Sequence, residues 1–260
     1  YCYPVKIIPS HLSEEELKVL ITDGMTKEGL TILESAEGLD LDVRKSTPKE
    51  ELAGIIGGYD AIIIRSATKL TADLIEAGKN LRVIGRAGIG VDNVDVEAAT
   101  KKGIVVMNTP EANAITTAEH TITLMLSLAR QIPQAHASLK SGKWERNKFK
   151  GIEIYGKTLG CIGLGNIGKL VAERAIGLKM NVIAYDPFLS KEAAERADVE
   201  LVTLDDLLKR SDIITIHTPL NSETKNLINK DTLEKTKKGL VLINCARGGV
   251  INEKDISEAI

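Results

Sequence analysis

The chain has 260 residues, of which 43% are hydrophobic, 27% charged and only 3% aromatic, and its net charge is −2. At roughly 150 residues per domain, this length predicts two domains. The near-neutral charge without a basic block argues against nucleic acid or an anionic membrane as the main partner, and no apolar run approaches the ~18 residues of a membrane span.

The three cysteines, Cys2, Cys161 and Cys245, are widely separated and have no histidine at metal-ligand spacing. We interpret them as reduced thiols of a cytoplasmic protein that has neither a disulfide framework nor a metal site.

Between residues 17 and 110, short β-branched runs alternate with segments of helical periodicity. Strands are expected at 17–23, 39–45, 60–66, 81–88 and 103–110. Helices are expected at 26–36, 48–58 and 71–79. Strand–helix alternation predicts a parallel sheet covered on both faces.

Residues 114–139 are expected to form one long helix, which Pro133 would kink. Its apolar positions Leu124, Leu128 and Ile132 follow four-residue spacing. A stripe of this kind must pack against another domain or another subunit.

A second alternation begins at Thr158. Strands are expected at 158–163, 180–186, 198–203, 212–219 and 239–246. A helix is expected to begin at Asn166, another covers 204–211, and Asn252 caps a last one.

The segment "GLGNIG" follows the first of these strands and opens the helix at Asn166. Its glycines Gly163, Gly165 and Gly168 have the spacing of a dinucleotide-binding turn, in which free N–H groups at the helix start attract a pyrophosphate. Asp186 ends the next strand, where an acid would bind a ribose 2′-hydroxyl group and repel a 2′-phosphate. The pattern therefore favours NAD over NADP. The alternative is a structural turn, with Asp186 merely starting an Asp-Pro turn.

The segment "NCARGGVI" places Arg247 after the last expected strand, beside two glycines. An arginine fork suits a carboxylate, and ligands of parallel sheets lie beyond the carboxyl ends of strands. On spacing alone, a surface arginine at a turn is the simpler interpretation.

Seven motifs in this order resemble the D-2-hydroxyacid dehydrogenase family over residues 17–260. They are "RSATK" (65–69), "GRAGIGVDNVD" (85–95), "MNTP" (107–110), "GLGNIG", "YDP" (185–187), "HTPL" (217–220) and "NCARGGVI". Within the family, the chain is most similar to the members that oxidise D-3-phosphoglycerate with NAD to 3-phosphohydroxypyruvate, a step of serine biosynthesis.

The resemblance implies an α/β chain of two tandem parallel-sheet domains. A leader (1–16) would precede a flavodoxin-like substrate domain (17–110) and a Rossmann NAD-binding domain (111–260) that is incomplete at its C-terminal end. Subunits of this family pair through the helix at 114–139, which implies a homodimer.

Site residues also follow from the resemblance. Arg247 would hold the substrate carboxylate as the catalytic arginine. The substrate side would comprise Arg65, Ser66, Arg86, Gly88, Ile89 and Gly90. The cofactor side would comprise Gly163, Gly165, Asn166, Ile167, Gly168, Asp186, Thr218, Cys245 and Ala246.

The catalytic histidine of the family and its glutamate partner would lie downstream of Arg247, outside this chain. None of His11, His120, His136 and His217 stands at the family's position for this base. We therefore expect the chain to be an incomplete form that is inactive by itself, since loss of a general base removes a factor of about 10²–10⁴ in rate.

Two alternatives stay open on the sequence. One is a glyoxylate or hydroxypyruvate reductase of the same family, although two arginines and Ser66 suit a phosphorylated 2-hydroxy acid better. The other is a catalytically silent NAD-binding module.

Overall fold

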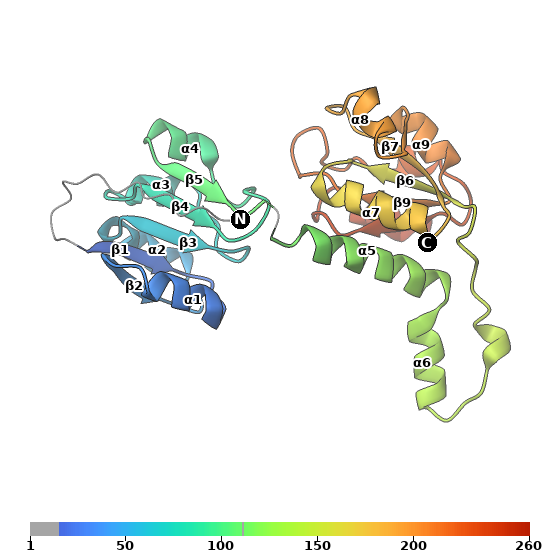
Figure 1. Cartoon of the computed structure of the whole chain (residues 1–260), viewed down its shortest axis with the longest axis horizontal. Coiled ribbons are helices and arrows are strands. Elements are labelled where there is room, and N and C mark those ends of the chain that lie inside the picture. Colours follow the sequence, from blue (N-terminus) through green and yellow to red (C-terminus); the bar gives the residue numbers. More distant parts are fainter. Residues whose placement is uncertain (1–15, 111) are drawn as a thin grey trace. The chain divides into compact units, whose positions relative to one another are not determined.

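The computed structural model describes residues 16–110 and 112–260. The chain forms two compact units that divide after Pro110 (Figure 1). We call them unit 1 and unit 2 and describe each by itself. The expected leader lies, apart from Glu16, outside the described residues.

Unit 1 contains five parallel strands in the order β2-β1-β3-β4-β5. The strands are β1 (Leu17–Ile21), β2 (Leu39–Val43), β3 (Ala61–Ile64), β4 (Val83–Arg86) and β5 (Val105–Asn108). This is the order 2-1-3-4-5 of flavodoxin-like sheets, and it confirms the predicted fold class of the first half.

The helices of unit 1 are α1 (Lys27–Glu34), α2 (Lys49–Ile55), η1 (Ile56–Gly58), α3 (Ala72–Ala77) and α4 (Val96–Lys101). Helix α4 was not among the predicted elements. Asp95 caps its start, and the Asp95 side chain accepts a hydrogen bond from the N–H group of Ala98 at 2.9 Å. An aspartate that caps an N-terminal N–H group in this way is a common helix start.

The two faces of the unit 1 sheet are not equally covered. Buried side chains of α2, α3 and α4 form a continuous apolar core with those of the strands. The other face carries α1 and an apolar hollow of about 510 Å³. Helices thus lie on both faces, as predicted, but Val105 and Met107 of the edge strand β5 are 55% and 58% exposed within the described residues.

Unit 2 also contains five parallel strands, in the order β10-β9-β6-β7-β8. They are β6 (Thr158–Ile162), β7 (Asn181–Tyr185), β8 (Glu200–Leu201), β9 (Ile213–Ile216) and β10 (Val241–Asn244). Counted within the unit, this is the Rossmann order 3-2-1-4-5, as predicted.

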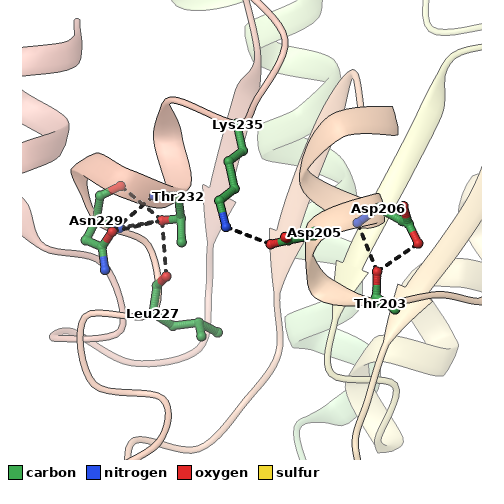
Figure 2. Close-up of polar contacts among 7 residues, drawn as sticks. All are labelled: Thr203, Asp205, Asp206, Leu227, Asn229, Thr232 and Lys235. Carbon is green, nitrogen blue, oxygen red and sulfur yellow. Dashed lines mark hydrogen bonds and ion pairs between the residues drawn. The ribbon is translucent and has the colours of Figure 1, made fainter.

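The helices of unit 2 are α5 (Ala114–Ala129), α6 (Ile132–Lys140), η2 (Arg146–Lys148), α7 (Asn166–Gly177), α8 (Lys191–Glu195), α9 (Leu204–Arg210), α10 (Lys230–Leu233) and α11 (Glu253–Ala259). Helix α5 packs on α7, and both contribute to the core around β6. Lys235, two residues after the short helix α10, forms an ion pair with Asp205 of α9 (Figure 2).

The expected single helix at 114–139 is two helices. Helix α5 ends at Ala129, and Gln131 adopts the left-handed region at φ 53° before α6 begins. Pro133 lies in the first turn of α6, where its missing N–H group costs nothing, so it is not the cause of the break. Helix α6 extends away from the sheet of unit 2 (Figure 1).

Candidate functional site

The glycine turn of unit 2 joins β6 to α7. Gly163 has φ +90°, and a Cβ atom there would lie 2.7 Å from the carbonyl oxygen of His217. A Cβ atom on Gly168 would lie 2.3 Å from the carbonyl oxygen of Gly163. Both positions therefore exclude every side chain, which explains why the turn needs glycine.

Gly165 has a different environment. A Cβ atom there would meet nothing within 4 Å, so the space above this residue is open. Gly165 also precedes the first turn of α7, where Asn166 and Ile167 present N–H groups without helical partners. A helix start with open space in front of it can accommodate a phosphate group.

Asp186 follows β7 and faces the glycine turn. Its Oδ2 atom accepts a hydrogen bond from the N–H group of Leu164 at 2.9 Å, and its Oδ1 atom accepts one from Phe188 at 2.9 Å. Each bond uses one lone pair, and a carboxylate has about four acceptor positions. Asp186 thus binds the backbone of the glycine turn and of its own turn, and it can still accept a hydrogen bond from a hydroxyl group.

His217 and Thr218 follow β9 beside the glycine turn. The Nε2 atom of His217 pairs with the hydroxyl group of Thr215 at 2.9 Å. The Nδ1 atom of His217 and the hydroxyl oxygen of Thr218 are buried and have no hydrogen-bond partner among the described residues. Buried polar atoms normally have partners, so these two atoms are candidates for contacts with a bound polar ligand.

Burial lowers the pKa of His217 to about 4, so this imidazole is neutral near pH 7. Burial also raises the pKa of the Cys161 thiol to about 12. Cys161 lies inside the sheet core and Cys245 is half-buried; both are free thiols.

Arg247 follows β10 and lines a hollow of about 660 Å³ that belongs wholly to unit 2. Its Nη1 atom donates to the carbonyl oxygen of Ala246 at 2.9 Å, and its own carbonyl oxygen accepts from Asn244 Nδ2 at 2.8 Å. We call this the Arg247 hollow. The residues that line it are Asn113, Thr116, Thr117, His120, Leu124, Asn244, Cys245, Ala246, Arg247 and Gly248.

His120, which does not stand at the family's position for the base, lies on α5. The structure places it in the Arg247 hollow with Cys245 and Ala246. The helical periodicity of the sequence does not predict this position, because the hollow forms where α5 meets the end of β10.

The predicted substrate residues of unit 1 lie at or after the carboxyl ends of β3 and β4. Arg65 and Ser66 are exposed on the loop that follows β3. The guanidinium group of Arg86 lies over Gly88, where a Cβ atom would overlap it. The Nε atom of Arg86 is buried and has no partner in the part of the chain that the structure describes. Gly88 has φ +156°, and Asn108 Nδ2 donates to the carbonyl oxygen of Ile89 at 2.6 Å. Gly90 follows in the same loop.

The structure thus brings the predicted residues together in two groups, one in each unit. The contacts of Asp23, Asn93 and Asn108 with these loops were missed from the sequence. Asn93 belongs to the quoted "GRAGIGVDNVD" motif and Asn108 to the quoted "MNTP" motif, so both could have been found there, whereas Asp23 lies in none of the quoted motifs.

Comparison with known proteins identifies the family. The model of the D-isomer specific 2-hydroxyacid dehydrogenase NAD-binding domain matches residues 122–260. The D-3-phosphoglycerate dehydrogenase of Archaeoglobus fulgidus is 52% identical over 244 residues, which is 94% of this chain and 46% of that protein. The enzyme of the same name from Methanocaldococcus jannaschii is 51% identical over 245 residues, 94% of this chain and 46% of that protein. The chain therefore spans about half the length of the curated relatives it matches.

Among solved structures, a D-lactate dehydrogenase from Aquifex aeolicus complexed with NAD and lactic acid superposes with a TM-score of 0.84. It is 28% identical, and the match covers 93% of this chain and 72% of that one. Unit 2 is accordingly an NAD-binding unit, and the open helix start, the glycine turn and the acid after β7 fit this cofactor.

Proposed function

The chain belongs to the D-isomer-specific 2-hydroxyacid dehydrogenase family, and from this premise we propose that the protein oxidises D-3-phosphoglycerate to 3-phosphohydroxypyruvate with NAD. The proposal is supported by the name shared by the curated relatives and by the arginines on the candidate loops. NAD, when bound, supplies the hydride acceptor.

We propose that Arg247 binds the substrate carboxylate, because a guanidinium fork matches a carboxylate with two hydrogen bonds. The Arg247 hollow leaves space beside it for a small anion. Arg65 and Ser66 would bind the phosphate group, with Arg86 as a second cation for it. Gly163, Gly165 and Gly168, with Asn166 and Ile167, would hold the pyrophosphate of the cofactor, and Asp186 its ribose.

We further propose that Thr218, Cys245 and Ala246 line the nicotinamide side of the cofactor. The buried hydroxyl oxygen of Thr218 lacks a partner in the described residues, which supports a polar contact there. Cys245 and Ala246 lie beside Arg247 in its hollow, so a ligand held by Arg247 would be in their reach.

The test is the steady-state rate of NADH formation, measured on the protein as its organism makes it. We expect a kcat/KM for D-3-phosphoglycerate at least about a hundredfold above those for D-lactate and glycolate, because the phosphate adds charge-assisted bonds. Similar values for all three acids would contradict the assignment of the substrate and favour the hydroxypyruvate-reductase alternative.

Arg65→Glu provides a second arm of this test. Charge reversal should reduce kcat/KM for D-3-phosphoglycerate far more than for glyoxylate reduction, since only the first substrate carries a phosphate. An equal reduction for both substrates would exclude Arg65 as a phosphate ligand.

A separate variant, His120→Gln, tests whether the histidine of the Arg247 hollow accepts the proton of the substrate hydroxyl group. An unchanged kcat would assign that role to another group.

We also propose that the protein is a cytoplasmic homodimer that pairs through α5 and α6. Four apolar side chains on or near these helices are exposed in the single chain: Leu128 (52%), Ile132 (54%), Leu139 (59%) and Trp144 (80%). Exposed apolar groups in such number mark an interface.

Light scattering after gel filtration should give a dimer that Leu139→Asp converts to a monomer. Ile32→Asp on α1, which is 71% exposed at another place, is the control and should stay dimeric. A monomeric wild-type protein would contradict the proposal.

A further inference from the structure

The loop of residues 65–68 is held by side chains from two other segments of unit 1. Arg65 and Ser66 are exposed at its start, while Thr68 at its end is only 8% exposed. An exposed loop has no strand partner for its backbone groups, so its shape depends on the groups that satisfy them.

Asp23, which follows β1, accepts three hydrogen bonds from this loop. Its Oδ2 atom accepts from the N–H groups of Arg65 at 2.7 Å and Thr68 at 3.0 Å, and its Oδ1 atom accepts from the Thr68 hydroxyl group at 2.6 Å. Because the Thr68 proton goes to a carboxylate, the Thr22 hydroxyl group must donate in its 2.9 Å contact with Thr68. Partial burial raises the pKa of Asp23, but the bonds from Thr68 and Arg65 outweigh it and the pKa lies below its usual value.

Asn93, from the loop after β4, binds carbonyl groups of the same loop, whereas Asp23 binds N–H and hydroxyl groups. Its Nδ2 atom donates to the carbonyl oxygens of Arg65 and Thr68, each at 2.6 Å. Both protons of the amide are thus used, while its Oδ1 atom is buried and has no partner within residues 16–110 and 112–260. Leaving the amide oxygen unsatisfied costs free energy, so the two hydrogen bonds donated by the amide nitrogen are the reason for this placement. The backbone continues the link, since the N–H group of Leu70 donates to the carbonyl oxygen of Asn93 at 2.8 Å.

We infer that Asp23 and Asn93 are positioning residues: together they fix the backbone of residues 65–68 and thereby set how tightly Arg65 and Ser66 bind the anionic end of the substrate. The inference rests on the proposed function, in which this loop binds the phosphate group. Neither residue touches the substrate; each acts through the loop.

The geometry makes different predictions for different substitutions. Asp23→Ala removes all three bonds. Asp23→Asn can keep both bonds to Oδ2 with its single oxygen, while its amide faces the Thr68 hydroxyl group, which can accept. Asn93→Asp is nearly the same size but places a carboxylate against two carbonyl oxygens that it can only repel.

A matched control lies at the opposite end of the same sheet. Asp60 precedes β3, and its Oδ2 atom accepts from the N–H group of Lys18 at 2.9 Å. Asp60→Ala therefore also removes an aspartate that binds a backbone N–H group in unit 1, but far along the strands from residues 65–68.

The experiment measures KM for D-3-phosphoglycerate, kcat, the dissociation constant of NADH and the melting temperature for the wild-type protein and these four variants. We expect Asp23→Ala and Asn93→Asp to raise KM by between about tenfold and a hundredfold, because a misplaced binding group costs this much. Asp23→Asn should stay within about threefold of the wild type. The affinity for NADH, which binds in unit 2, should not change.

A merely structural role gives another result. In that case Asp23→Ala and Asn93→Asp would behave like Asp60→Ala: each would lower the melting temperature and leave KM unchanged. This result would overturn the inference. An increase in KM for Asp60→Ala as large as that for Asp23→Ala would overturn it too. If the wild-type protein itself neither binds nor oxidises the acid, the proposed function fails and the inference falls with it; that case is recognised from the wild type alone.

Discussion

His217 is kept neutral by its surroundings, and this makes it a source of pH-dependent stability. Its folded-state pKa of about 4 lies below the value of about 6.5 that an unfolded chain gives. Between these two values the unfolded chain binds a proton that the folded chain does not. The free energy of unfolding therefore falls as the pH falls through this window, by up to about 3 kcal/mol.

This prediction is checked by urea unfolding of the wild-type protein and His217→Gln at about pH 7 and about pH 4.5. Carboxylates also titrate near the lower pH, so the difference between the two proteins is the quantity of interest. The wild type should lose more stability than the variant. Equal losses would mean that the imidazole is protonated in the folded chain.

At the residue scale, local patterns and long-range contacts were not equally predictable. Gly163 and Gly168 follow from the sequence because the positive φ of Gly163 and the contact of Gly168 with the Gly163 carbonyl group both arise within one turn. Asp23 contacts Arg65 across 42 positions of the chain, and Asn93 contacts the same residue across 28. No local period records such partners, so only the folded sheet reveals them.

At the element scale, the end of α7 carries a strained residue. Lys179 has φ 62° and follows the helix in a Schellman arrangement, in which its N–H group bonds to Ile176 and that of Met180 bonds to Ala175. Glycine suits this position because it has no Cβ atom. Lys179 is exposed, so its removal leaves no cavity.

We therefore expect Lys179→Gly to stabilise the protein by about 0.5–1 kcal/mol. Thermal unfolding of the variant and the wild type measures this. A lower melting temperature for the variant would show that the lysine side chain stabilises more than its backbone strain costs.

Two polar interactions near α10, a capping box and an ion pair, can be compared for their contribution to stability (Figure 2). Asn229 and Thr232 form a capping box: the Thr232 N–H group donates to Asn229 Oδ1 at 3.1 Å, and the Asn229 N–H group donates to the Thr232 hydroxyl oxygen at 2.8 Å. The nearby ion pair between Lys235 and Asp205 spans 2.8 Å, but its side chains are 42% and 55% exposed.

Thr232→Val keeps the bond to Asn229 Oδ1 but removes the hydroxyl group that accepts from the Asn229 N–H group, so it should cost about 1 kcal/mol. Lys235→Met should not change stability measurably, because exposed ion pairs are screened by water. Chemical unfolding of both variants distinguishes the two interactions. A larger loss for Lys235→Met than for Thr232→Val would reverse this ranking.

The types and order of the elements were largely predictable, because β-branched runs and helical periods alternate clearly. The break between α5 and α6 was not. Proline is the obvious helix breaker in the sequence, yet the chain turns at Gln131, and Pro133 begins the next helix. A proline alone does not say whether it ends a helix or starts one.

At the scale of the whole molecule, both units use one scheme. Each has a parallel sheet, and in each the candidate residues follow the carboxyl ends of the strands, where helix starts and loops leave backbone groups free for ligands. Within the described residues, no helix is long and apolar enough to cross a membrane.

The central claim is that the glycine turn of unit 2 holds NAD, and titration of the protein with NADH tests it most directly. Gly168→Ala should weaken binding about tenfold or more, because its Cβ atom would displace the Gly163 carbonyl group and with it the helix start. The matched control is Gly177→Ala at the other end of α7, where a Cβ atom meets nothing within 4 Å and binding should not change. A folded Gly168→Ala protein that binds NADH as tightly as the wild type would contradict the account.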